Sequence, residues 1–138
     1  MDGEIQIIQK SDEWETSELH PGLRWQLSVN TGVTVSNGLS CGYLQVAAGA
    51  ELPLHSHKEQ EIYIITKGSA ELLTGENSTR SVRAGNTVYI PENSWHGIRN
   101  TGRTRIEFIW IFPTDSWQEV RYVFANSALN QPQTDLNE

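Results

Sequence analysis

Three side chains that could bind one metal ion lie close together in the sequence: His55, His57 and Glu61. Because neighbouring side chains of a strand alternate between its faces, His55 and His57 would point to the same side of an extended segment. A hairpin at the short loop Lys58-Glu59-Gln60 would return the carboxylate of Glu61 to the two imidazoles. These three groups cover part of the coordination shell of a metal, so we expect a further ligand from elsewhere in the chain.

His96 is the candidate for that further ligand. It follows Pro91, which ends an apolar segment at residues 87–90. Imidazoles with a carboxylate suit Fe, Mn, Ni, Zn or Cu, and they leave coordination positions for water or a substrate. A His-x-His pair alone is more often exposed than part of a metal site, so the second stretch adds weight. The remaining histidine, His20, precedes Pro21 in an expected loop, and we expect it at the surface.

The segments around these residues alternate like strands. Trp25, Leu27 and Val29 alternate with polar residues. Turn sequences such as Asn37-Gly38 and Thr74-Gly75-Glu76-Asn77 separate the apolar segments. Short strands with such turns predict an all-β fold, either a sandwich or a closed barrel. The further expected strands are Gly42 to Ala47, Glu61 to Thr66, Ser69 to Leu73, Thr87 to Ile90, Trp95 to Arg99, Arg105 to Phe112 and Val120 to Phe124.

The two ends of the chain are expected to differ from its centre. Charged and apolar positions mix near the N-terminus, where Ile5, Ile7 and Ile8 suggest an edge strand. The other end is polar, rich in Asn and Gln, and expected to be flexible. We therefore predict an N-terminal arm over residues 1–20, one barrel domain over 21–125 and a tail over 126–138.

The composition excludes several classes of function. The 138 residues carry a formal net charge of −7, which gives no electrostatic reason to bind nucleic acid or an anionic membrane face. Cys41 is the only cysteine, so no disulfide can form within the chain. A secretory signal pattern and an apolar stretch of membrane-spanning length are both absent, which makes a cytoplasmic protein the expectation.

The two histidine-containing stretches together resemble the paired motifs of the cupin superfamily. The first reads Gly-x5-His-x-His-x3-Glu-x6-Gly over residues 49–68, and the second reads Gly-x5-Pro-x4-His-x3-Asn over 85–100. The second departs at Asn93, where cupins usually have glycine, and Asn tolerates the left-handed backbone of a glycine. The resemblance implies a single jelly-roll β-barrel, often dimeric. It also implies that one divalent transition metal is bound by His55, His57, Glu61 and His96.

Aromatic residues add candidates for substrate contacts. Tyr63 has the same parity as Glu61 on their expected strand, so its ring should face the metal. A nearby dication favours a phenolate, which could act as a general base, although Glu-x-Tyr also occurs where the ring only packs. Tryptophans that face the cavity would attract a cationic ligand. Our candidates for substrate binding are Trp25, Trp95 and Trp110.

A narrower resemblance concerns the small cupin lyases that cleave dimethylsulfoniopropionate. It runs over about residues 21–124, and its more specific parts are Trp-Ile-Phe-Pro-Thr-Asp at 110–115 and the later Tyr122. In that family a tyrosine matching Tyr63 removes the α-proton, and one matching Tyr122 assists. The resemblance implies a metal-dependent carbon–sulfur lyase in which the metal binds the substrate carboxylate and a tyrosine acts as base. Dimethyl sulfide and acrylate would be the products.

Two other classes of function remain open from the sequence. A metal-dependent cupin dioxygenase uses the same set of three histidines and one glutamate. A non-catalytic, small-molecule-binding cupin needs only the cavity. We expect a small zwitterionic or carboxylate ligand and a homodimer, because the resemblance implies a dimer and the alternating residues 4–9 could add a strand to a partner's sheet.

Overall fold

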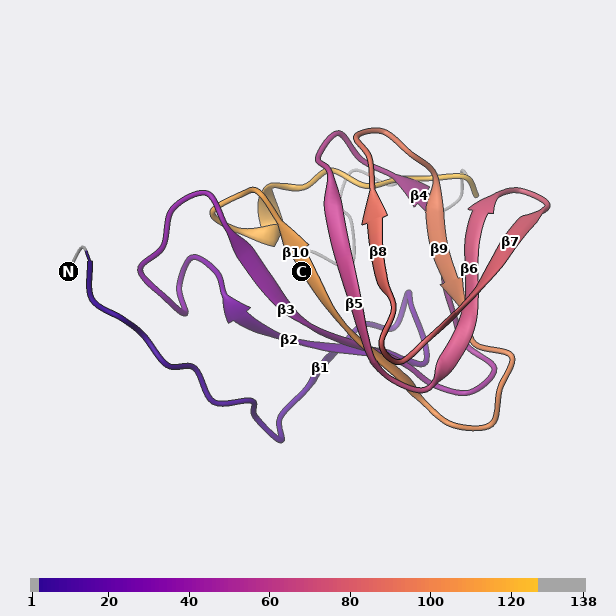
Figure 1. Ribbon diagram of the computed structural model, residues 1–138, viewed down its shortest axis with the longest axis horizontal. Coiled ribbons are helices and arrows are strands. Elements are labelled where there is room, and N and C mark those ends of the chain that lie inside the picture. The colour runs from indigo at the N-terminus through magenta and orange to yellow at the C-terminus, as the bar shows by residue number, and fades with distance from the viewer. Residues whose placement is uncertain (1–2, 127–138) are drawn as a thin grey trace.

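The computed structural model describes residues 3–126, and these are mostly β-structure (Figure 1). A short 3₁₀ helix, η1 (Trp117–Glu119), lies between the last two strands. In this range no helix has the length and hydropathy that a membrane-spanning helix needs. The strands are β1 (Glu15–Thr16), β2 (Leu23–Val29), β3 (Ser40–Val46), β4 (Glu51–Ser56), β5 (Glu61–Lys67), β6 (Ser69–Gly75), β7 (Ser78–Arg83), β8 (Thr87–Ile90), β9 (His96–Arg99), β10 (Ile106–Phe112) and β11 (Val123–Phe124).

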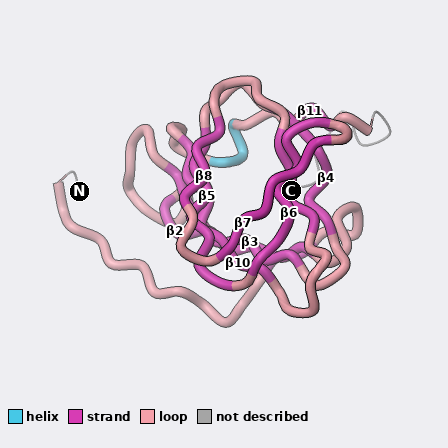
Figure 2. The backbone as a smooth tube through the Cα atoms, turned by 45° about the vertical axis from the view of Figure 1, so that its right-hand side comes forward, coloured by secondary structure: helices cyan, strands magenta, loops and turns pink. Residues whose placement is uncertain are grey.

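The strands form two antiparallel sheets. The larger sheet has the order β1-β2-β3-β10-β5-β8, and the smaller has the order β11-β4-β9-β6-β7. Figure 2 shows the strands curving around a common interior, with η1 at one end. Several neighbouring strands, such as β3 with β10 and β4 with β9, come from distant parts of the sequence, as in a jelly roll. The fold is therefore an all-β barrel of the jelly-roll type that the motifs imply.

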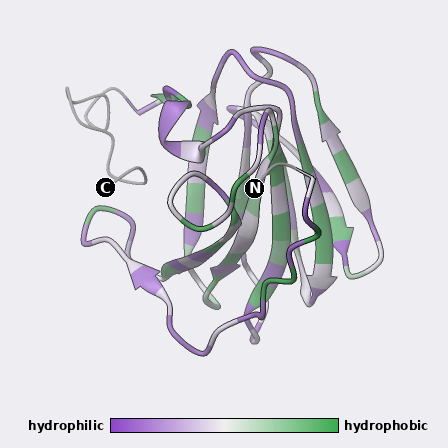
Figure 3. Cartoon of the chain, turned by 90° about the vertical axis from the view of Figure 1, so that its left-hand side faces the viewer, coloured by the Kyte–Doolittle hydropathy of each residue, from purple (hydrophilic) through white to green (hydrophobic). Residues whose placement is uncertain are grey.

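Hydrophobic side chains at alternate positions of the strands point inward and fill this interior. Figure 3 shows the resulting hydrophobic bands. On β5, Glu61, Tyr63 and Ile65 are buried, whereas the residues between them are partly exposed. Phe108 and Trp110 of β10 are buried on the same interior. The parity argument that turned Tyr63 toward the inside is confirmed by this pattern.

The structure differs from the predicted strands at β7 and near β11. β7 pairs with β6 although only Val82 of its residues is buried, so its polar sequence carried no strand signal. Of the strand predicted over residues 120–124, only Val123 and Phe124 pair, opposite Ser56 and His55. The preceding segment forms η1 because Ser116 caps it, accepting a hydrogen bond from the backbone of Gln118.

The edge strand predicted around Ile5, Ile7 and Ile8 is not formed. Residues 4–10 belong to no strand and run away from the sheets as an arm (Figure 1). The side chain of Gln6 makes two hydrogen bonds with the backbone of Val35, at 2.7 and 3.0 Å. Because Gln6 faces the protein, the alternate residues Ile5 and Ile7 point outward and are 93% and 94% exposed. The predicted tail lies almost wholly outside the described residues.

A buried carboxylate anchors the base of this arm. Glu107 of β10 accepts hydrogen bonds from Lys10 at 3.0 Å, from Gln45 at 2.6 Å and from Thr66 at 3.3 Å. Burial opposes the charge of Glu107. The hydrogen bonds from Gln45 and Lys10, with the positive charges of Lys10 and Lys67, outweigh burial and hold the pKa of this carboxyl below its ordinary value.

Replacing Glu107 with Gln should lower the free energy of unfolding near neutral pH by about 1–3 kcal/mol, because a charged acceptor is lost. Since folding lowers the pKa of Glu107, its contribution is present above the ordinary value of 4.5 and is lost as the pH falls through the folded-state value. Urea denaturation of parent and Glu107→Gln should therefore show a difference that shrinks from about pH 7 to about pH 3. An equal difference at both pH values would contradict this role.

The homodimer stays a prediction, and Ile5 and Ile7 are the surface that we expect a second copy to cover. Light scattering at micromolar concentration should give twice the chain mass of 15.5 kDa. The double variant Ile5→Lys/Ile7→Lys should be monomeric, because a dimer interface would bury the two added charges. Glu4→Lys is the control for added charge alone and should stay dimeric. A monomeric parent protein would rule the dimer out.

Candidate metal centre

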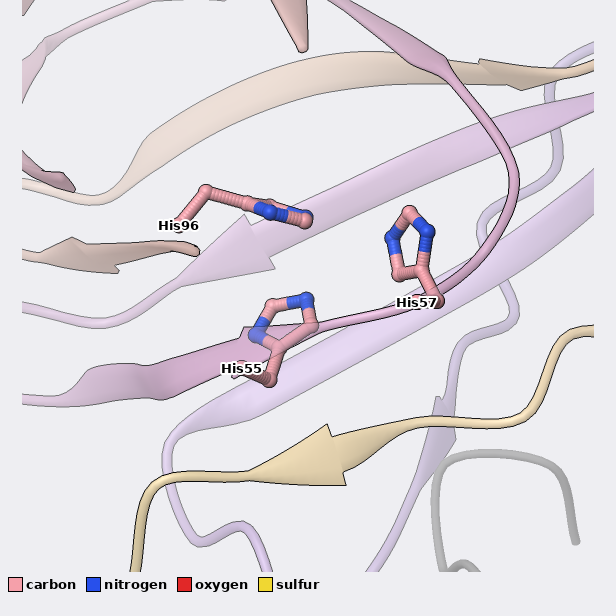
Figure 4. Close-up of side chains that lie close together, drawn as sticks. All are labelled: His55, His57 and His96. Atoms are coloured by element: carbon pink, nitrogen blue, oxygen red, sulfur yellow. The ribbon is translucent and has the colours of Figure 1, made fainter. Parts of the chain in front are cut away.

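Three histidines converge inside the barrel (Figure 4). His55 lies in β4, His57 directly follows that strand, and His96 begins β9. β4 and β9 pair, with His55 opposite His96. All three side chains are buried, and one ring nitrogen of each lies within 4.8 Å of the other two. This group can hold a metal ion. Its members are the three histidines that the sequence motifs predicted to meet.

Glu61 brings a carboxylate to the same point from the other sheet. Its Oε1 lies 3.0 Å from Nε2 of His57 and 3.2 Å from Nε2 of His96. The expected hairpin is wrong, because β4 and β5 belong to different sheets and do not pair. The loop at residues 58–60 instead carries the chain across the barrel. Glu61 therefore meets the histidines across the interior.

Backbone carbonyls orient all three imidazole rings through Nδ1. A carbonyl oxygen only accepts hydrogen bonds, so each Nδ1 carries a proton and each Nε2 of a neutral ring keeps its lone pair. Such contacts to the second ring nitrogen are the usual way in which a protein orients a metal-binding histidine. The three contacts are His55 with Pro53 at 2.7 Å, His57 with Glu59 at 2.9 Å and His96 with Ser94 at 2.8 Å.

The donor set fits a divalent cation. Burial opposes the charge of Glu61, yet the hydrogen bonds and charges of His57 and His96 outweigh burial and hold the pKa of Glu61 below its ordinary value. Burial lowers the pKa of His55 well below its ordinary value, and the nearby His96 adds to this effect. The Nε2 atoms of His57 and His96 can donate to Glu61 only while they carry protons, and a divalent metal ion would displace those protons and coordinate the same atoms.

One backbone turn links the two ligand-bearing stretches. Asn93 has a φ of 63°, the left-handed conformation that the motif requires at this position. Its backbone N–H donates to the carbonyl of His57 at 2.9 Å. The substitution of glycine by Asn93 therefore leaves the turn intact, and the turn holds the segment before His96 against His57.

An aromatic cavity adjoins the histidine cluster. Its volume is about 30 Å³, which is room for about two water molecules. A Cβ atom at Gly42 would come within 2.5 Å of the indole ring of Trp110. The observed position of this ring therefore requires a glycine at position 42. Most of the wall is aromatic: Trp25, Tyr63, Phe108, Trp110, Phe112, Trp117 and Tyr122.

Both tyrosines that the sequence singled out line this cavity. The ring of Tyr63 lies 4.4 Å from that of Phe108 and 5.9 Å from that of His96, between centroids. Tyr122 is half-buried, and its ring lies 5.4 Å from that of His55. Burial raises the pKa of both phenols well above the ordinary value, and the charge of Glu61 raises both further. Each hydroxyl therefore keeps its proton unless a positive charge offsets Glu61.

Two residues lie elsewhere than the sequence led us to expect. Trp95 is 43% exposed and does not line the cavity, because the adjacent His96 takes the inward position of an alternating segment. His20, expected at the surface, is 2% exposed. Its ring lies 5.4 Å from that of Phe124, which in turn lies 5.6 Å from His55. Trp117 lines the cavity although its spacing in the sequence gave no reason to single it out.

Comparisons with known proteins agree with this architecture. Residues 42–112 match the family described as a cupin domain. The dimethylsulfoniopropionate lyase DddW of Ruegeria pomeroyi is 26% identical over 113 residues, which are 82% of this chain and 73% of that protein. The dimethylsulfoniopropionate lyase DddQ of the same organism is 32% identical over 72 residues, 52% of this chain and 36% of that protein.

Solved structures show the same fold. The polyketide cyclase RemF from Streptomyces resistomycificus has a TM-score of 0.74 at 19% identity and covers 89% of this chain and 88% of its own. The structure of DddQ has a TM-score of 0.68 at 23% identity, with 82% and 60% covered. At such low sequence identities, the structural similarity shows a common fold and nothing more specific. The matched segment 42–112 spans more than half of the 138 residues and contains all four converging side chains, so the chain belongs to the cupin domain family.

Proposed function

We propose that this protein is a metal-dependent lyase that cleaves dimethylsulfoniopropionate to dimethyl sulfide and acrylate. The observation that carries the proposal is that Tyr63 and Tyr122 line the same cavity as His55 and Glu61, two of the four converging side chains. The likeness to two lyases that act on this compound supports the choice of substrate.

The four converging side chains, His55, His57, Glu61 and His96, are the proposed metal ligands. A bound divalent metal would act as a Lewis acid on the substrate carboxylate and make the neighbouring α-hydrogen more acidic. With Glu61 engaged as a ligand, its negative charge no longer raises the pKa values of the two phenols. Fe, Mn, Ni, Zn and Cu all accept this ligand set, and no redox change is needed.

Tyr63 is the proposed general base. Its oxygen takes the α-proton, the electron pair of that C–H bond forms the double bond of acrylate, and the C–S bond breaks to release neutral dimethyl sulfide. Tyr122 reaches the cavity from the segment between η1 and β11 and would assist as a second hydroxyl. Because Tyr122 is half-buried and lies outside helix and strand, it is the side chain that we expect to move when a ligand larger than the cavity enters.

Two tryptophans form a part of the cavity wall that suits the sulfonium group of the proposed substrate. Trp25 and Trp110 line the cavity, so the faces of their rings can attract the sulfonium group by cation–π interaction. Their burial also keeps water away from the carbon that loses its proton. Trp95, the third candidate from the sequence, lies outside the cavity and has no place in this proposal.

The function is tested by incubating metal-loaded protein with dimethylsulfoniopropionate under argon and measuring dimethyl sulfide in the headspace. A lyase releases dimethyl sulfide without oxygen, since the elimination is redox-neutral. Products that form only after oxygen is admitted would indicate a dioxygenase. Failure to release dimethyl sulfide with each of the five candidate metals would contradict the lyase.

Tyr63→Phe gives the sharpest test of the base. It keeps the ring against Phe108 and deletes only the hydroxyl, so turnover should fall by about 10²–10⁴-fold while metal content is retained. The loss should appear in kcat more than in KM, because the substrate contacts remain. Tyr122→Phe should lower turnover less.

The matched control is Tyr89→Phe. Tyr89 is 59% exposed, and its hydroxyl donates to Gln60 outside the cavity at 2.8 Å, so its loss should leave turnover unchanged. A rate for Tyr63→Phe within about threefold of the parent would remove Tyr63 as base and make Tyr122 the next candidate.

Metal content is the third readout. Elemental analysis of the purified protein should find close to one transition metal per chain, and the double variant His55→Ala/His57→Ala should lose it, because two of the four ligands are gone. Far-UV circular dichroism checks that the variant still folds. Stoichiometric metal in a folded double variant would show that the ion binds elsewhere.

A further inference from the structure

Two hydrogen-bond donors in the cavity wall have no partner. The indole N–H groups of Trp25 and Trp117 are buried, and no acceptor within residues 3–126 bonds to either. Both side chains line the cavity, and the two residues are 2% and 6% exposed. Buried donors in proteins are nearly always paired, because an unpaired one destabilises the fold. Both belong to residues of one cavity wall, and a ligand that accepts hydrogen bonds would pair them.

The two donors lie away from the histidines. The rings of Trp25 and Trp117 are 5.8 Å apart between centroids, and Trp117 is 5.8 Å from Trp110. Trp110 in turn contacts Phe112, whose ring lies 5.2 Å from that of His57. Among the described residues, no ring contact joins Trp25 or Trp117 directly to a histidine. The cavity wall therefore has His55 and Glu61 of the metal-binding cluster at one end and the two tryptophans at the other.

The fold fixes both indoles in place. Trp25 lies in β2, paired with Glu15 of β1 on one side and with Leu44 of β3 on the other. Trp117 begins η1, and its backbone N–H donates to Oδ1 of the buried Asn30 at 2.9 Å. Donors held in this way lose little conformational freedom when a ligand binds, which is the condition for a preorganised binding site.

We propose that Trp25 and Trp117 form a second binding subsite, which receives an oxygen of a compact dicarboxylic acid whose other carboxylate lies at the histidine and Glu61 end. Such a diacid is larger than the cavity, so its entry requires the same movement of Tyr122 as entry of the proposed substrate. A carboxylate is the strongest acceptor for such donors. The faces of these rings attract a sulfonium, whereas their N–H edges attract oxygen, so the subsite distinguishes ligands by what lies opposite their metal-bound carboxylate. The inference rests on the metal centre of the proposed function but not on cleavage of dimethylsulfoniopropionate, which has a single carboxylate and leaves both donors unpaired.

Calorimetry with the metal-loaded protein tests the subsite. The probes are malonate, succinate and glutarate, each compared with the monocarboxylic acid of the same chain length: propionate, butyrate and pentanoate. At least one dicarboxylate should bind about tenfold or more tightly than its matched monoacid, the gain expected from about 1.4 kcal/mol of added hydrogen bonding. In Trp25→Phe and Trp117→Phe, which keep a ring and delete the N–H, this preference should fall to within about threefold, with monoacid affinity retained.

Trp110→Phe is the matched control, because Trp110 lines the same cavity but its N–H is not among the unpaired groups. The preference for the dicarboxylate should persist in this variant. If one of the two subsite variants fails to fold, the other carries the test. Equal binding of dicarboxylates and monoacids by the parent, or an undiminished preference in a folded subsite variant, would overturn the proposal. A preference for dicarboxylates without release of dimethyl sulfide would support the subsite and contradict the lyase; release without the preference would do the reverse.

Discussion

The contact between the ionised carboxylate of Glu61 and the buried imidazoles is the constraint on which the site depends. The three rings donate through Nδ1 to backbone carbonyls, which leaves each Nε2 to bind either a proton or a metal ion. In a low-dielectric interior, such a cluster is stable when a cation joins its members. β4 and β9 deliver the histidines from one sheet and β5 delivers Glu61 from the other, so the same cation would also link the two sheets.

The net charge at Glu61 and the histidines influences whether the two phenols of the cavity wall keep their protons. Burial and the charge of Glu61 keep Tyr63 and Tyr122 protonated, so neither phenol is a base by itself. A dication at the cluster reverses the sign of the local charge, and the same two hydroxyls then lie next to a group that favours phenolate. The aromatic wall increases this effect because it excludes water, which would otherwise screen the charge. In the proposed function, metal binding and base strength would therefore be coupled through one carboxylate.

The sequence predicted the elements whose spacing is local. Parity placed Tyr63 beside Glu61, and the tolerance of Asn for left-handed backbone accounted for Asn93. The paired motifs predicted which histidines meet. These predictions hold because strand alternation and turn conformation depend on neighbours in the chain. The specific part of the chemistry came from resemblance, since imidazoles and a carboxylate alone do not select a substrate.

Features that depend on contacts between distant segments could not be predicted in this way. His20 was expected at the surface, yet its ring packs against that of Phe124, which comes from a distant part of the sequence. The polar strand β7 forms because β6 offers it an edge, which its own sequence does not reveal. Glu61 reaches the histidines across the barrel, although a hairpin would have satisfied the same spacing. The unpaired indole of Trp117 becomes visible only when its neighbours are known.

The most direct test of the central claim is the anomalous scattering of a metal-loaded crystal, recorded at the absorption edge of the bound metal. A single peak should lie about 2.0–2.3 Å from Nε2 of His55, His57 and His96 and from a carboxylate oxygen of Glu61. Coordination through Nδ1, or a metal peak elsewhere with none at these four side chains, would contradict the claim that Glu61 and the buried imidazoles are joined by a cation.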